Sequence, residues 1–150
     1  MVSFEKLYDA FLSTISSYTL SQMSDDDVRA ELFNIASNAI TRFKFPKVSL
    51  SYSLNELEGK YYFDNNVTQK ELNVIIAHMK VVWLEFQISK EQRFQMQYYD
   101  NNVKTFSMGN ILAQLNRMYE NFVKQAKDIE YNYGRVNING GSTIGNINHD

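Results

Sequence analysis

The stretch that decides the fold is TQKELNVIIAHMKVVWLEFQISK, residues 68–90. Thr68 and Glu71 have the spacing of a capping box, in which both side chains bond to free backbone amides where a helix begins. Apolar residues then recur every three or four positions, which predicts a long helix of roughly 30 Å at ~1.5 Å per residue. The apolar stripe consists of Leu72, Ile75, Ile76, Met79, Val82, Trp83 and Phe86, and it is widened by Val74 and Val81. We therefore expect a central helix that is covered on more than one side.

The composition is that of a single domain with a substantial core. The chain has 150 residues, 44% of them hydrophobic, with ten Tyr and ten Phe. So many aromatic rings indicate core packing, or contacts between subunits, where aromatic residues are enriched. The formal charge is −2, so no overall field draws the protein onto nucleic acid or acidic membranes. There is no cysteine, which leaves no disulfide and no thiolate, and no apolar run approaches the ~20 residues of a membrane span.

Two further helices are expected before the central one. Ser3 can cap the first, and the second begins at Ser24 with three aspartates in its first turn. Acidic side chains there complement the helix dipole, which explains them better than a metal site does. The second helix should stop near Lys44, because the residue before Pro46 avoids the helical conformation. The apolar positions of the first helix are Phe4, Leu7, Tyr8, Phe11, Leu12 and Ile15.

Between the second helix and the central one, the period of the pattern changes from about 3.6 to two. Apolar and polar residues alternate from Val48 to Leu54, which predicts a strand or extended segment with one buried face. Gly59 turns the chain, with Glu56 and Glu58 as solvated charges in an exposed turn. An extended aromatic segment, residues 60–63, follows.

After Lys90 the helical pattern weakens. A second hairpin or an irregular loop is expected between Arg93 and Phe106, because apolar residues alternate there and Asp100 begins an Asp-Asn-Asn turn. A last helix, capped by Ser107, should end at Gly134. Its stripe consists of Ile111, Leu115, Met118, Phe122, Ala126 and Ile129, and Lys124, Lys127 and Glu130 face away from that stripe.

The final residues, RVNINGGSTIGNINHD, have a different composition from the rest of the chain. They are rich in Asn, Gly, Ser and Thr and hold too few apolar side chains for a core of their own. Their isolated Val and Ile residues fit either disorder or a strand that pairs with the sheet edge of another subunit. We therefore expect a helical domain, 1–134, and an extended C-terminal tail, 135–150. The expected fold class is mainly α, a small bundle of about four helices with a short β-hairpin or extended segments and a flexible C-terminal tail.

No pattern of residues indicates catalysis. The motifs HExxH, CxxC, GxGxxG and GxxxxGK[ST] are all absent. His78 is expected to pack beside the apolar stripe of the central helix, and His149 is next to the C-terminus. Arg42, Lys44 and Lys47 could touch phosphates, but three cations spread over six positions are a weak signal, and a solvated helix end explains them better. We expect a protein that is not an enzyme and that has no catalytic, cofactor-binding or metal-binding residues.

A resemblance to a known family extends over most of the chain, and four segments carry it. They are FEKLYDAFL (4–12), AITRFKFPKVSLSY (39–52), FDNNVTQKELNVIIAHMKVVWLEFQI (63–88) and KTFSMGNILAQLNRM (104–118). In their order along the chain and in their patterns of apolar and polar residues, they resemble the head–tail connector proteins of tailed bacteriophages. These are also called head-completion or portal adaptor proteins. These are small helical subunits that form a ring beneath the portal.

The resemblance implies a structural virion protein of the neck, assembled in the host cytoplasm. A ring of about twelve copies would sit under the portal, extend the DNA channel and dock the tail. The implied partners are further copies of the chain, the portal protein and the next neck or tail protein. Double-stranded DNA would pass through the lumen without sequence-specific binding, in genome packaging and ejection, and no membrane is involved. No cofactor is implied.

The resemblance also separates core residues from contact residues. In this interpretation the core is anchored by Ile75, Met79, Trp83, Phe86, Leu115 and Phe122. Contacts between subunits, or with the portal, would come from Tyr98, Tyr99, Phe106, Arg135, Val136, Ile138, Ile144 and Ile147. Two alternatives stay open: a tail-completion, tail-terminator or other neck ring protein, and a soluble helical adaptor with no role in a virion.

Overall fold

The computed structural model describes the backbone of residues 1–15, 24–100 and 106–147, and side chains within these ranges except at 98–100, 106–108 and 136–147. The described elements are, in chain order, α1 (Phe4–Thr14), α3 (Asp25–Arg42), β1 (Tyr52–Asn55), β2 (Lys60–Phe63), α4 (Gln69–Asp100) and α5 (Phe106–Ile147). The described residues form four helices and a short antiparallel hairpin, so the expected mainly helical class is confirmed.

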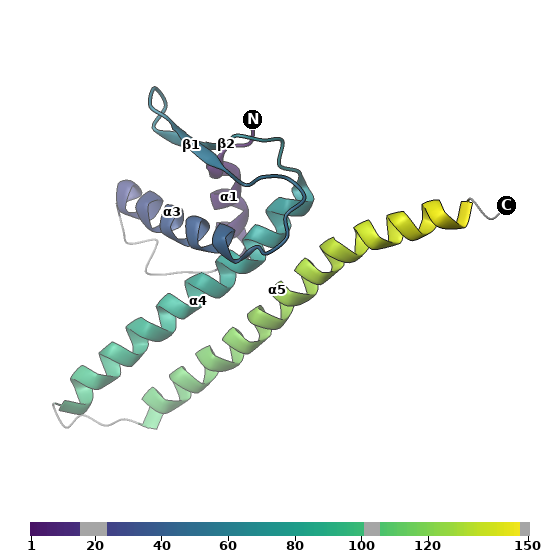
Figure 1. The fold of residues 1–150 in the computed structure, drawn as a ribbon. Coiled ribbons are helices and arrows are strands. Elements are labelled where there is room, and N and C mark those ends of the chain that lie inside the picture. Colours follow the sequence, from purple (N-terminus) through teal and green to yellow (C-terminus); the bar gives the residue numbers. More distant parts are fainter. Residues whose placement is uncertain (16–23, 101–105, 148–150) are drawn as a thin grey trace.

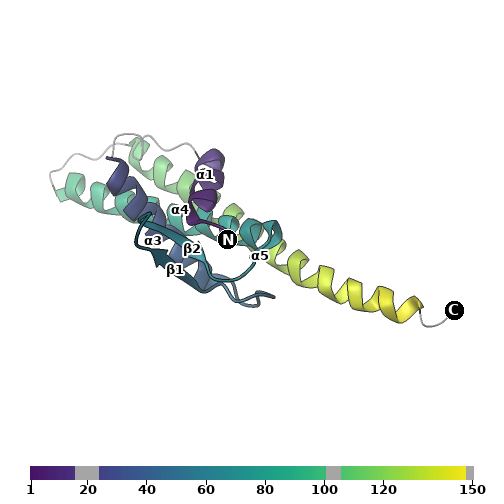
Figure 2. The same cartoon turned by 90° about the horizontal axis from the view of Figure 1, so that it is seen from above.

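The molecule is built around a pair of long antiparallel helices. Figures 1 and 2 both show α4 and α5 running side by side in opposite directions. α1, α3 and the β-hairpin gather around the first half of α4 (Figure 1). The last part of α5, drawn in yellow, extends past the first residues of α4 and away from the other elements (Figure 1).

The first half of α4 is buried on nearly every side, as its wide apolar stripe predicts. α1 and α3 pack on one side of it and α5 on another. Its buried apolar residues in the main core are Leu72, Val74, Ile75, Met79, Val82, Trp83 and Leu84. A second, smaller cluster holds Ala77 and Val81 of α4 against Ala126 of α5. Small side chains at these positions let the two helix backbones approach each other closely.

A cluster of aromatic rings joins α1, α3 and the hairpin. The Phe4 ring centroid lies 4.9 Å from those of Tyr52 and Phe63, and the Phe33 and Tyr61 rings stack at 4.3 Å. The backbone N–H of Phe63 also donates to the carbonyl of Val2 at 2.9 Å. The chain before α1 therefore runs along β2 and brings the first helix onto the sheet.

Three of the four expected helix starts, after Ser3, Ser24 and Thr68, are confirmed, although the caps differ in their bonds. The expected cap at Ser107 is wrong, because α5 begins at Phe106 and Ser107 lies within it. The Ser24 hydroxyl accepts from the Asp27 N–H at 3.3 Å, whereas Ser3 precedes α1 without a side-chain capping bond. Of the capping box, one half is present: the Glu71 carboxylate accepts from the Thr68 N–H at 3.0 Å and also from the Thr68 hydroxyl. α3 ends at Arg42, close to the stop expected before Pro46.

The hairpin was expected from the period-two pattern and is confirmed, with a shorter first strand. Tyr52 pairs with Phe63 and Asn55 with Lys60. Residues 48–51, which we expected to begin the strand, precede β1 without pairing as part of it. Leu54 is 47% exposed, so the expected burial of one face does not reach the end of the strand.

The hairpin or loop expected between Arg93 and Phe106 is wrong for residues 93–100, where α4 continues to Asp100. Asn101 to Thr105 lie outside the described residues. The alternation of Phe94 and Met96 was misleading, because both side chains lie on the exposed second half of a helix. Extending an existing helix costs little, since each added residue gains a hydrogen bond, and this segment has no proline or glycine to stop it.

The stop expected at Gly134 is also wrong, as is the extended backbone expected for 135–147, since α5 continues as a helix to Ile147. Residues 148–150 lie outside the described residues. The physical reason lies in the role given to Gly134. A glycine ends a helix by taking a positive φ, and among the described glycines only Gly59 has one. Within a helix a glycine costs only about 1 kcal/mol relative to alanine, which does not force the chain to turn.

Gly59→Ala is expected to lower the free energy of unfolding by about 1 kcal/mol. Gly59 has φ 64°, and a Cβ there would meet nothing within 4 Å, so the cost comes from the left-handed backbone alone. Urea unfolding followed by circular dichroism measures the change. The matched control is Gly109→Ala, which also meets nothing within 4 Å but lies in α5. The control should be neutral or stabilise by up to about 1 kcal/mol; equal effects at both positions would contradict the prediction.

Candidate interaction surface

The strongest candidate site is a groove between the end of α3 and the second half of α5. It has a volume of about 520 Å³, and we call it the Phe45 groove. Two segments far apart in the sequence form it, one directly after α3 and one on α5. Its lining residues are Lys44, Phe45, Lys127, Glu130, Tyr131, Tyr133, Gly134 and Arg135.

Two aromatic side chains stand out in this groove because they are exposed. Phe45 is 83% exposed and Tyr131 is 69% exposed. Isolated apolar residues are common on protein surfaces, but two rings lining one hollow mark a place where another molecule can bury them. Burial of a side chain of this size gains about 1.5–3 kcal/mol. The groove therefore has a source of binding energy that the folded chain does not use.

The floor of the groove is fixed by hydrogen bonds from Tyr133. Its hydroxyl donates to Oε1 of Glu71 at 2.9 Å and accepts from the Lys47 N–H at 2.8 Å. The Lys47 ammonium lies 4.4 Å from the centre of the Tyr133 ring, and the Phe43 ring meets that ring edge-on at 5.2 Å. These contacts hold the segment after α3 against both α4 and α5, so the groove is formed before anything binds.

A second polar contact lies beneath the groove and involves His78 and Glu130. Oε1 of Glu130 accepts from the Lys44 N–H at 3.0 Å and lies 3.5 Å from Nε2 of His78. Burial lowers the pKa of His78, and the Glu130 carboxylate offsets this only in part, so the imidazole is neutral at neutral pH. The expectation that His78 is a packed residue is confirmed. Glu130, which we expected to face away, points to the chain after α3 instead.

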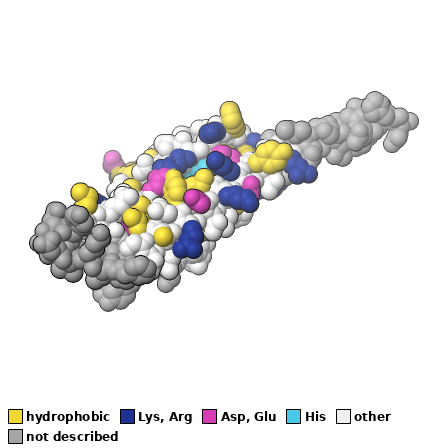
Figure 3. Space-filling view, turned by 90° about the horizontal axis from the view of Figure 1, so that it is seen from below, with side chains coloured by type: hydrophobic (Ala, Val, Ile, Leu, Met, Phe, Trp, Pro, Cys, Tyr) yellow, Lys and Arg dark blue, Asp and Glu magenta, His cyan; other side chains and the backbone are white. Residues whose placement is uncertain are grey.

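The rim of the groove is basic. Lys44, Lys127 and Arg135, which we call the basic rim, are all exposed, while the carboxylate of Glu130 is occupied by the contacts beneath. Figure 3 shows exposed apolar side chains next to lysine and arginine side chains on the lower face of the molecule. An apolar floor with a positive rim fits a partner that presents an apolar side chain among acidic ones.

Arg42 does not belong to this basic surface. Its guanidinium forms a two-pronged pair with Glu85, at 2.9 and 2.6 Å, and Tyr119 donates to the same carboxylate at 3.1 Å. The hydrogen bonds and charge of Arg42 hold the pKa of Glu85 below its usual range. The grouping of Arg42 with Lys44 and Lys47 as a solvated helix end is therefore wrong for Arg42, which ties α3 to α4 and α5.

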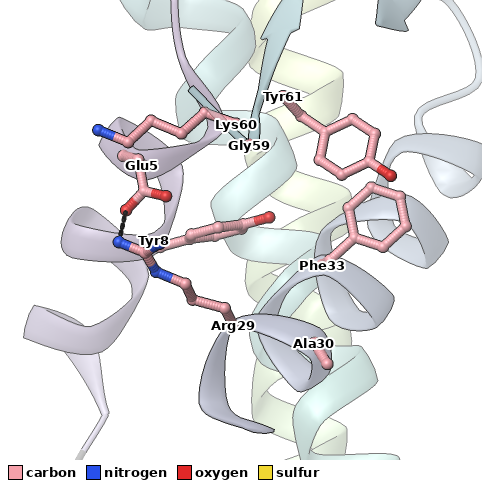
Figure 4. A pocket seen from close by; sticks show the side chains of 8 residues that line it. All are labelled: Glu5, Tyr8, Arg29, Ala30, Phe33, Gly59, Lys60 and Tyr61. Atoms are coloured by element: carbon pink, nitrogen blue, oxygen red, sulfur yellow. Dashed lines mark ion pairs between the residues drawn. The ribbon is translucent and has the colours of Figure 1, made fainter. Parts of the chain in front are cut away.

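A smaller pocket lies between α1, α3 and the hairpin, with a volume of about 260 Å³ (Figure 4). Tyr8, Phe33 and Tyr61 form its aromatic side, and burial raises the pKa of Tyr8 well above its usual range, so the phenol keeps its proton. At its edge the Arg29 guanidinium lies 3.9 Å from Glu5. Since these charges partner each other and the rings pack together, this pocket is a weaker candidate than the Phe45 groove.

The core residues expected from the sequence lie where they were expected. Ile75, Met79 and Trp83 are buried in the main core. Three further expected anchors are partly buried and pack against it, and they are Phe86, Leu115 and Phe122.

The expected contact residues are only partly described. Arg135 is exposed and lines the Phe45 groove. The backbones of the others lie in helices, Tyr98 and Tyr99 at the end of α4 and Phe106 at the start of α5. The remaining four, Val136, Ile138, Ile144 and Ile147, lie on the last turns of α5. Their side chains are outside the described residues, so the contacts expected of them stay a prediction.

Sequence reasoning missed Phe45 and Tyr131 as surface residues. A signal existed for Phe45, because it stands directly before Pro46, outside both the helical stripe and the alternating pattern. The signal for Tyr131 was weaker, and it was only that this residue lies outside the apolar stripe of α5. Neither signal shows that the two rings share a groove, which depends on how α3 and α5 pack.

Comparison of the chain with protein-family models, with curated proteins and with solved structures finds no match. Within the part of the chain that the structure describes, no three His, Cys, Asp or Glu residues are grouped so that they could hold a metal ion. Within the same part, no helix combines the length and the apolar character needed to cross a membrane.

Proposed function

We propose that this chain is a structural subunit of a bacteriophage neck, a head–tail connector that forms a ring of about twelve copies beneath the portal. The ring would extend the DNA channel and dock the tail. Its partners would be its own copies, the portal protein and the next neck or tail protein. The subunit acts by shape and stacking, without chemical change of a substrate.

The observation that carries this proposal is the projecting part of α5. α5 is 42 residues long, against 32 for α4, and Figure 1 shows it extending past the start of α4. A helical arm that leaves the body of its own subunit can contact a neighbour or an adjoining ring. The order of sequence segments that resembles connector proteins supports the same function, and the mainly helical fold favours a connector over a tail terminator.

The Phe45 groove is a second support. Subunits of a ring need surfaces that a monomer leaves exposed, and this groove combines exposed aromatic rings with a formed shape. Aromatic residues and arginine are enriched at such interfaces. The groove and the arm meet on α5, because Arg135 lines the groove directly before the projecting residues.

The direct test mixes the purified protein with the portal protein encoded in the same genome and images the product by electron microscopy. Rings of about twelve subunits on one face of the portal are expected. If the protein binds neither the portal nor any other component of the particle, it is not a connector, and the soluble adaptor takes its place.

Removal of residues 135–150 is expected to abolish ring assembly while the body stays folded. Among the side chains that the structure describes, the main core contains none beyond Tyr133, so the free energy of unfolding should change by less than about 0.5 kcal/mol. Urea unfolding measures the first effect and imaging on the portal the second. The control keeps the length but replaces 136–147 with a sequence of Ala, Glu and Lys. Loss of assembly in both variants assigns the contact to the side chains of the arm, and normal assembly of the truncated chain would remove the arm from the proposal.

A further inference from the structure

The turn between β1 and β2 presents an apolar side chain to solvent in a fixed position. Leu57 is 99% exposed. The turn around it is held by Asn55, whose Oδ1 accepts from the N–H groups of Leu57 at 3.1 Å and Glu58 at 3.4 Å. Gly59 closes the turn by donating to the carbonyl of Asn55 at 2.8 Å. A leucine on a braced turn loses little conformational freedom on binding, which favours a role in recognition.

The two neighbours of this leucine are acidic. Glu56 and Glu58 are both exposed, so Leu57 stands between two carboxylates. The Tyr62 hydroxyl donates to Glu58 and keeps that side chain beside the turn. The turn is thus an apolar tip with a negative surround, whereas the Phe45 groove is an apolar hollow with a positive rim. The two surfaces are complementary in shape and in charge.

We propose that the β1–β2 turn of one subunit docks in the Phe45 groove of a neighbouring copy. Leu57 packs between Phe45 and Tyr131, and the carboxylates of Glu56 and Glu58 face the basic rim. One contact then covers three of the most exposed apolar side chains of the described chain. This inference rests on the proposed ring, for which it names the surfaces that join adjacent subunits.

The contact has to form between two copies. Figure 1 shows the turn between β1 and β2 pointing away from α5, so a subunit cannot fill its own groove. A contact between two different surfaces is heterologous, and it closes into a ring when the rotation between subunits is a whole fraction of a turn. A second copy also explains the acidic surround of Leu57, which a nucleic acid in the groove would leave unexplained.

Cysteine cross-linking tests the contact directly, because the natural chain has no cysteine. Leu57→Cys and Tyr131→Cys are made in separate chains, mixed, and treated with a short bis-maleimide, both free at high concentration and bound to the portal. We expect cross-linked dimers from the mixture, and far fewer from either variant alone. Met96→Cys, which replaces another exposed apolar residue, is the control partner for Leu57→Cys. A yield from Leu57→Cys with Tyr131→Cys no higher than this control overturns the proposal.

Charge reversal gives an independent test. Glu56→Lys and Lys127→Glu should each weaken self-association, measured by sedimentation, and the chain that carries both should recover it. Leu57→Ser should weaken self-association about tenfold or more, as expected for losing one buried leucine. All three sites are exposed, so each variant should fold. Failure of the double variant to recover overturns the proposed pairing.

The result also separates this inference from the proposed function. Rings on the portal without the Leu57–Tyr131 cross-link would support the connector function and contradict the docking contact. The cross-link without portal binding would keep the contact and remove the connector. If Lys127→Glu abolishes binding of the protein to duplex DNA and leaves self-association unchanged, the groove binds nucleic acid and the docking proposal is wrong.

Discussion

Phe4→Ala is expected to lower the free energy of unfolding by about 3–5 kcal/mol, the largest effect of any substitution considered for this protein. The Phe4 side chain is 1% exposed and contacts rings from three elements. Its ring centroid lies 4.9 Å from Tyr52 and Phe63, 5.8 Å from Tyr61 and 6.2 Å from Phe33. Alanine would leave a cavity that these rings cannot close, since each is held by its own backbone.

Phe45→Ala is the matched control for this prediction. It removes the same atoms from a ring that is 83% exposed, so the free energy of unfolding should change by less than about 0.5 kcal/mol. Both variants are compared by urea unfolding with circular dichroism and tryptophan fluorescence, which the single Trp83 supplies. Loss of α1 alone, with the α4–α5 pair unchanged, would show as a two-step transition. Similar small effects at both positions would contradict the packing described for α1 and the hairpin.

Glu71→Ala is expected to lower the free energy of unfolding by about 2–4 kcal/mol. Glu71 is 4% exposed and lies where α4 begins. Its carboxylate accepts from the Thr68 N–H, from the Thr68 hydroxyl and from the Tyr133 hydroxyl of α5. The alanine variant leaves the buried Tyr133 hydroxyl without its acceptor and removes the bonds that fix Thr68 at the start of α4. Glu71→Gln keeps an acceptor oxygen and should cost less, about 1 kcal/mol.

The same carboxylate predicts how stability depends on pH. Burial alone raises the pKa of Glu71, but the hydrogen bonds from Thr68 and Tyr133 outweigh it, so its pKa lies below the usual value of 4.5. A carboxyl group whose pKa is lowered by folding stabilises the native state above the unfolded pKa. That stability is lost as the pH falls below 4.5 and through the folded pKa. The Arg42-paired Glu85, whose pKa is also lowered, adds a loss in the same direction.

Urea unfolding at neutral pH and at a series of acidic pH values measures this loss. Glu71→Gln cannot titrate, so its stability should fall less on acidification than that of the natural chain. Glu120→Gln, at an exposed position on α5, is the control and should follow the natural chain. If Glu71→Gln loses stability on acidification as steeply as the control, the carboxylate is not held in its ionised form by these bonds.

The contacts of Glu71 also show where sequence reasoning ends. Thr68 and Glu71 are three residues apart, and their spacing alone predicted the start of α4. The bond from Tyr133 to Glu71 joins residues 62 positions apart and had no signal in the sequence. It forms because α5 runs back along α4, which places Tyr133 next to the first turn of α4.

The two errors in helix length have a common cause. For residues 93–100 and again at Gly134, a local pattern of alternation or a single glycine was taken as the end of a helix. Both are weak signals beside the cost of ending a helix, which leaves backbone carbonyls without partners. The helix boundaries were confirmed at the Ser24 and Thr68 starts. They were also confirmed before Pro46, where steric clashes prevent the helix from continuing.

The amino-acid sequence by itself determined which segments become helices, where three of them begin and which faces are apolar, because spacing and capping act within a few residues. Only the tertiary structure decided that Phe45 and Tyr131 share a groove, that Arg42 forms an ion pair with Glu85, and that Leu57 is left fully exposed. The physical reason is distance along the chain. Lys44 and Glu130 are 86 residues apart, and only the packing of α3, α4 and α5 into one core brings such segments together.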